Sequence, residues 1–185
     1  MRRLLPAIAA LGLYTLGAEA GPDDWPRFRG PNGTGISDAK TIPATWTDQD
    51  YNWKVTLPGT GHSSPVVWAN RLFVTCGDAK TATRILLCLE AATGKTLWQR
   101  DFAGKPYRQH GDNAYASASP AADADGVVVS LSTPDEVALA AFDNEGKDAW
   151  RRGLGPWVGN HGTGVSPIIA GDLVILANEQ EDPKL

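Results

Sequence analysis

One short pattern occurs three times along the chain, and this repetition restricts the possible folds more than any other feature. The copies are residues 64–74, 119–129 and 166–176, and they start 55 and 47 residues apart. Each begins with Ser-Pro, continues with a short apolar pair, carries Asn or Asp six residues after the serine, and ends in an apolar run. Proline is tolerated at the start of a strand, and Asn or Asp beside Gly or Ala favours a tight turn. The sequence therefore predicts a repeat protein whose units each open with a β-hairpin.

Further strand-like segments follow the hairpins. The predicted strands are residues 66–68, 72–76, 85–89 and 96–102 in the first unit, and 127–131, 137–142 and 149–152 in the second. Four antiparallel strands in about 45–55 residues are typical of a β-propeller blade. A four-stranded sheet that is apolar on both faces cannot stand alone, so blades stack around an axis. The predicted fold class is all-β: a partial β-propeller of four-stranded antiparallel blades, two complete and one begun.

A tryptophan recurs on the predicted outermost strand of each unit. Trp98 follows Gly94 by four residues, and Trp150 follows Gly146 by four residues. Trp53 takes the same place in a leading strand, predicted over residues 51–57, without the preceding strands. An indole buries a large area in one piece, so it is suited to wedge between adjacent blades. The residues to which the repeat assigns a structural role are Trp53, Trp98, Trp150, Gly94, Gly146, Pro65, Pro120 and Pro167.

The N-terminus has the pattern of a secretory signal peptide over residues 1–20. A basic start precedes an apolar run of about 15 residues, which is short for a membrane span, and Ala18-Glu19-Ala20 fits a cleavage site. Export to the periplasm or beyond, with cleavage near Ala20, is expected, and no other segment is apolar enough to cross a bilayer. Residues 21–60 form a polar lead-in. Its aromatic residues Trp25, Phe28 and Trp46 are costly to leave in water, so they predict an ordered segment.

The segments 89–98 and 141–150 resemble the tryptophan-docking repeat of pyrroloquinoline quinone (PQQ)-like propellers. The start, Trp25-Pro26-Arg27-Phe28-Arg29-Gly30-Pro31-Asn32-Gly33-Thr34-Gly35, resembles the lead-in of secreted bacterial members of that group. The resemblance covers residues 24–180. It implies a propeller and no particular activity, because the superfamily holds quinoprotein dehydrogenases as well as cofactor-free scaffolds such as the lipoprotein of the outer-membrane β-barrel assembly machinery.

The resemblance also implies a full-length protein of about seven or eight blades. Here the expected blades are residues 61–103, 115–153 and 161–185, and the last of these is incomplete. Fewer than three blades cannot close on themselves and leave exposed sheet faces and edges. The sequence therefore indicates the N-terminal piece of a longer protein whose remaining blades complete the ring; pairing with other chains is the alternative.

The three histidines precede the three units at comparable places. In a propeller, the connections between units emerge on one face, around the mouth of the central channel, and neutral imidazole is a common metal ligand and acid–base group. The ligand-binding candidates are His62, His110, Asn113, Asn160 and His161, with Arg108 and Asp112 as companions. The histidines stand 3, 10 and 6 residues before the proline of each copy, so no symmetric ring of ligands is implied. Polar loop residues without a ligand are the simpler interpretation.

The two cysteines lie on the second and third predicted strands of the first unit. With the turn near residues 79–80, Cys88 is expected opposite Arg71 or Leu72. The thiols are then about four residues, or ~13 Å, apart along the strands, which is too far for a disulfide. Two free thiols are predicted.

These features favour an exported scaffold or binding module for a protein or small-molecule ligand. A net charge of −4 without a basic patch argues against nucleic acid as a partner. No catalytic residue and no metal site are assigned, since residues 123–126 are too short for a calcium loop, and no cofactor is expected. The enzyme alternative is a PQQ-dependent dehydrogenase with quinone and calcium at the channel mouth, and a third hypothesis is a ligand sensor that uses the histidines.

Overall fold

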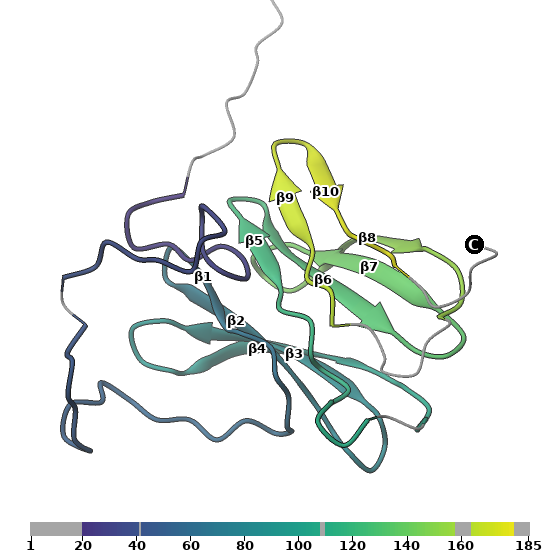
Figure 1. Ribbon diagram of the computed structural model, residues 1–185, viewed down its shortest axis with the longest axis horizontal. Helices are drawn as coiled ribbons and strands as arrows, with labels where there is room; N and C mark the ends of the chain where they lie inside the picture. The colour runs from purple at the N-terminus through teal and green to yellow at the C-terminus, as the bar shows by residue number, and fades with distance from the viewer. Residues whose placement is uncertain (1–19, 41, 108–109, 158–163, 180–185) are drawn as a thin grey trace, which may run out of the picture.

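The computed structural model describes residues 20–40, 42–107, 110–157 and 164–179 (Figure 1). Within these ranges the chain forms ten β-strands and no helix. Two four-stranded antiparallel sheets, each with its strands in chain order, are followed by a two-stranded hairpin. The predicted all-β fold, with two complete blades and one begun, is confirmed; the total of seven or eight blades stays a prediction.

The strands follow the predicted segments closely. Blade one consists of β1 (Val66–Trp68), β2 (Arg71–Gly77), β3 (Arg84–Glu90) and β4 (Thr96–Phe102). Blade two consists of β5 (Ala121–Asp123), β6 (Gly126–Ser132), β7 (Val137–Phe142) and β8 (Asp148–Gly153), and the third hairpin of β9 (Ile168–Ala170) and β10 (Leu173–Ile175). The central strands β2, β3, β6 and β7 are apolar on both faces, and the outermost strands β4 and β8 are largely exposed.

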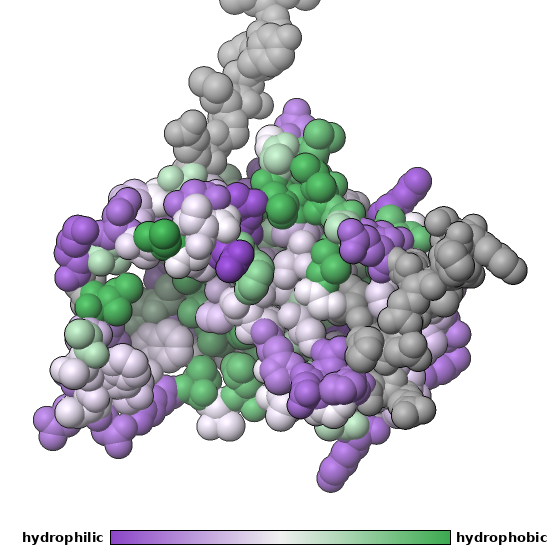
Figure 2. All heavy atoms as spheres, in the orientation of Figure 1, coloured by the Kyte–Doolittle hydropathy of each residue, from purple (hydrophilic) through white to green (hydrophobic). Residues whose placement is uncertain are grey.

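The main core lies between the two blades. Phe73, Leu86 and Cys88 of blade one meet Val127, Val129 and other side chains of blade two, with Trp98 and Phe102 packed at the edge. The opposite face of blade two packs against Ile169 and Val174 of the third hairpin. The outward side of this hairpin is apolar and exposed, as the green patch over β9 and β10 shows (Figure 2). Each blade therefore covers one face of the next.

The three Ser-Pro copies touch one another through their serines. The Ser64 backbone N–H donates to the Ser119 Oγ at 2.8 Å, and the Ser119 N–H donates to the Ser166 Oγ at 2.9 Å. Strands β1, β5 and β9, which follow these serines, lie side by side as the first strands of successive blades (Figure 1). The sequence suggested only a strand start here. The serine is in fact the hydrogen-bonding link from each blade to the next.

We expect Ser119→Ala to lower the free energy of unfolding by about 1–3 kcal/mol, because the Ser64 N–H then loses its hydrogen-bond acceptor at the contact between the blades. Ser119 is 2% exposed, so water cannot readily replace the lost hydroxyl. Urea unfolding followed by tryptophan fluorescence measures the change. Ser64→Ala is the matched control, since within the described ranges the Ser64 hydroxyl accepts no such bond. Equal losses of unfolding free energy in the two variants would contradict the role of the Ser64–Ser119 hydrogen bond.

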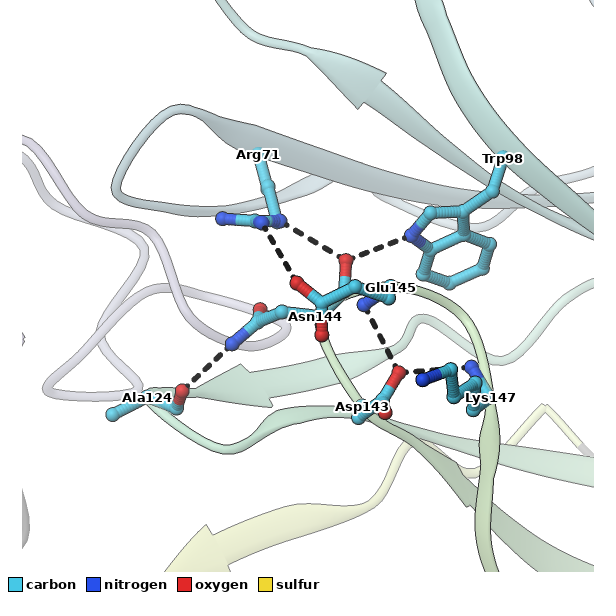
Figure 3. A network of polar contacts seen from close by, with 7 residues as sticks. All are labelled: Arg71, Trp98, Ala124, Asp143, Asn144, Glu145 and Lys147. Atoms are coloured by element: carbon cyan, nitrogen blue, oxygen red, sulfur yellow. Dashed lines mark hydrogen bonds and ion pairs between the residues drawn. The ribbon is translucent and has the colours of Figure 1, made fainter.

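Trp98 fixes the outer part of the same interface (Figure 3). Its indole Nε1 donates to the carbonyl oxygen of Asn144, in the β7–β8 turn, at 3.0 Å. The Arg71 Nε donates to the same oxygen at 3.2 Å, and the Asn144 side chain donates to the carbonyl oxygen of Ala124 at 2.8 Å. Trp53 repeats the arrangement one blade earlier, with its Nε1 donating to the Ala91 carbonyl at 3.0 Å. Each tryptophan thus docks onto the β3–β4 or β7–β8 turn of the following blade.

The strand predicted over residues 51–57 is wrong. This segment forms no strand, and the isolated pair nearest to it, Thr60–Gly77, lies outside it. A strand requires a partner ladder, and no described residue supplies one to this segment. Trp53 is held by its indole instead.

The predicted register of the cysteines is also wrong, although both thiols are free and buried. Cys88 lies opposite Phe73, and Cys76 lies opposite Ile85. The β2–β3 loop is centred one residue later than expected, and such a shift moves the pairing by two residues. Cys88 belongs to the core between the blades, whereas Cys76 belongs to the core on the other face of the sheet. Opposite faces keep the thiols apart.

Burial raises the pKa of the Cys88 thiol from an ordinary 9.0 to about 11. The unfolded chain therefore loses this proton first, and between these two pH values the folded state binds more protons than the unfolded state. Stability should fall as pH rises from about 9 to about 11. Denaturant unfolding at pH 8, 9.5 and 11 should show a steeper loss for the wild type than for Cys88→Ala. Parallel losses would contradict the assignment.

Candidate binding face

The two ends of the blades differ in construction. Tight turns close one end, at residues 69–70, 91–95, 124–125 and 143–147. The longer β2–β3 loop, the β4–β5 connection and the four-residue β6–β7 turn lie at the other end, which we call the loop end. There the Thr60–Gly77 pair brings the lead-in to β1 against blade one, and the His62 N–H donates to the Ala116 carbonyl at 2.9 Å. The segments that precede successive blades therefore meet at the loop end.

The structure places three of the five predicted ligand-binding residues at this end. The His62 and His110 side chains are exposed. The Asp112 N–H donates to His110 Nδ1 at 3.3 Å. Asn113 is half-buried, and its Oδ1 accepts hydrogen bonds from the Ala114 N–H at 3.0 Å and from the Ser117 hydroxyl.

The backbone contact between His62 and Ala116 places His62 against the connection that carries His110 and Asn113. Asn160, His161 and Arg108 lie outside the described residues. The ligand-binding role of the set stays a prediction.

The lead-in covers the inner edges of the blades. The backbones of Trp25 and Val67 exchange two hydrogen bonds of 2.9 Å, and the Ala122 N–H donates to the Pro26 carbonyl at 2.8 Å. The unpaired edges of β1 and β5 are therefore both protected by one segment. The expectation of buried aromatic anchors holds for Trp25, which is half-buried. It is wrong for Phe28 and Trp46, which are 51% and 62% exposed.

The sequence reasoning missed Arg84, the first residue of β3, which is buried at the loop end beside Tyr107 and Tyr115. The sequence pattern could have singled out this residue. In the period-two pattern of a strand, Arg84 shares a face with Leu86 and Cys88, so a cation lies on a face that is otherwise apolar.

Within the described ranges, no group of three or more His, Cys, Asp or Glu side chains is arranged to hold a metal ion, and no helix is long and apolar enough to span a membrane.

Two comparisons with known proteins found matches. A crystal structure of BamB from Moraxella catarrhalis matches 68% of this chain and 33% of its own chain, with 19% sequence identity and a TM-score of 0.46. The chain thus spans about a third of that protein. No curated protein sequence matches. The family profile described as outer membrane protein assembly factor BamB matches residues 44–182, well over half of the sequence. The chain belongs to this family.

Proposed function

We propose that the chain is part of an exported β-propeller scaffold that binds another protein at its loop end. Family membership supports a role in protein interaction, since the family is described as an assembly factor. The location rests on one observation. The segments that precede the two blades meet at this end, and each carries an exposed histidine, His62 or His110.

Site-specific photocrosslinking in the producing cell tests this proposal. A benzophenone amino acid at position 62 or 110 should yield a discrete crosslinked partner. The same group at Lys95, in the β3–β4 turn at the opposite end, is the matched control and should yield none. Equal crosslinking from both ends, or none from the loop end, would contradict the location.

The proposal includes export with removal of residues 1–20. Mass spectrometry of the protein recovered from its native compartment should give a chain that begins at Gly21. A chain that retains Met1 would contradict cleavage.

The proposal assigns the chain no redox chemistry of its own. We expect neither a spectral change nor dye reduction when PQQ and calcium are added to the purified protein. Dye reduction that depends on both additions would support the dehydrogenase alternative instead.

A further inference from the structure

Arg84 is a cation enclosed between the blades. It is 4% exposed and lies on the face of β3 that packs against blade two. Its guanidinium carbon lies 5.5 Å from the ring centre of Tyr115 and 5.9 Å from that of Tyr107. The two rings meet edge to face, with their centres 5.3 Å apart. The rings therefore form an aromatic wall beside the guanidinium.

The hydrogen bonds of Arg84 leave its charge uncompensated. The Nη1 donates to the Ala82 carbonyl at 3.2 Å, and the Nη2 donates to the Tyr107 hydroxyl at 3.4 Å. The buried Nε has no partner, and within the described ranges no carboxylate lies within ion-pair distance of Arg84. Burial lowers the pKa of Arg84, yet a guanidinium remains protonated at neutral pH. A buried cation without a counter-charge is costly, so a bound anion would stabilise this arrangement.

Two hollows meet at this side chain. The inner hollow has room for about one water molecule and is lined by Arg84, Phe102 and Tyr115 among others. The outer hollow has a volume of about 240 Å³ and shares Arg84, Phe102 and Leu131 with the inner one. Arg151 and Glu136, which form an ion pair with each other, also line it.

We propose that this pocket between the blades binds a small carboxylate, with its charged head against Arg84 and its apolar body along Phe102 and Leu131. A guanidinium donates to carboxylate oxygens. Phosphate has no apolar body to lie along these two side chains. The site goes beyond the scaffold role, because no residue of it belongs to the histidine set. The carboxylate comes from a free small acid or from the C-terminus of a peptide.

Thermal unfolding of the chain with sodium propionate tests the proposal, with sodium chloride and sodium phosphate at equal ionic strength for comparison. Propionate should raise the midpoint with a saturating concentration dependence, because a ligand that binds only the folded state stabilises it. Chloride and phosphate should not. A tripeptide ending in a free valine carboxylate, compared with its amidated form, separates the sources. Saturation by propionate alone identifies a free acid, and saturation by the free peptide identifies a C-terminus.

Arg84→Met should abolish the propionate response, and it should fold because an apolar side chain of similar length replaces an unpaired buried charge. Arg84→Lys keeps the positive charge but loses the planar set of donors, so it should weaken the response. Arg152→Met, on the exposed strand β8, is the matched control and should respond like the wild type. If Arg84→Met does not fold, Arg84→Lys against Arg152→Met decides. A wild-type response that never saturates, or an undiminished response in the Arg84 variants, would overturn the proposal.

Discussion

Trp98→Ala is expected to lower the free energy of unfolding of the chain by about 3–5 kcal/mol, the range found when a large core aromatic is truncated. Trp98 bridges the blades, with its ring centre 5.9 Å from that of Phe73 and its indole N–H bonded to the β7–β8 turn. The substitution opens a cavity beside Phe73 and removes one of the two donors to the Asn144 carbonyl. Equilibrium unfolding in guanidinium chloride, followed by far-ultraviolet circular dichroism, measures the loss.

Trp150→Ala is the matched control for Trp98→Ala. Trp150 has the same place in blade two, but it is 42% exposed, and no turn docks on it within the described part of the chain. We expect Trp150→Ala to cost less than about 1 kcal/mol, as surface substitutions usually do. Equal losses would show that burial against a following blade is not what makes the repeated tryptophan stabilising.

The blades could be predicted because their signals are local. Asn70 and Asp125 mark two-residue turns, and the runs on either side match the strands within about two residues. A blade closes by pairing neighbours in sequence, so turn chemistry and the period-two pattern carry most of the information. The register of β2 against β3 was missed because their six-residue loop carries no unique turn signal, and its centre sets every pair in the ladder.

Most contacts between the blades could not be predicted from the sequence. The bond from Ser64 to Ser119 and the docking of Trp98 on Asn144 join residues 55 and 46 positions apart, and only the second could be expected in outline from the repeated tryptophan. Arg84 stood on an apolar face in the pattern, but what surrounds it depends on how two blades stack. The histidine set shows the same limit, since comparable positions before each unit do not determine where the side chains point.

Gly146→Ala is expected to cost about 2–5 kcal/mol, from left-handed strain and a clash together. Gly146 has a φ of +79°, and an added Cβ would lie 2.7 Å from the Trp98 Cδ2. The indole cannot easily retreat, because its N–H is bonded to Asn144 and its ring packs against Phe73. Circular dichroism during guanidinium unfolding again provides the measurement.

Gly171→Ala isolates the backbone part of this cost. Gly171 has a φ of +56°, and an added Cβ would meet nothing within 4 Å, so only the left-handed strain of about 1–2 kcal/mol remains. The excess loss in Gly146→Ala should disappear when Trp98 is already alanine, because the clashing ring is then absent. A double-mutant cycle over these two sites should therefore give a coupling energy of about 1–3 kcal/mol. Additive losses would mean that the glycine is required for its backbone conformation alone and not for the tryptophan that rests on it.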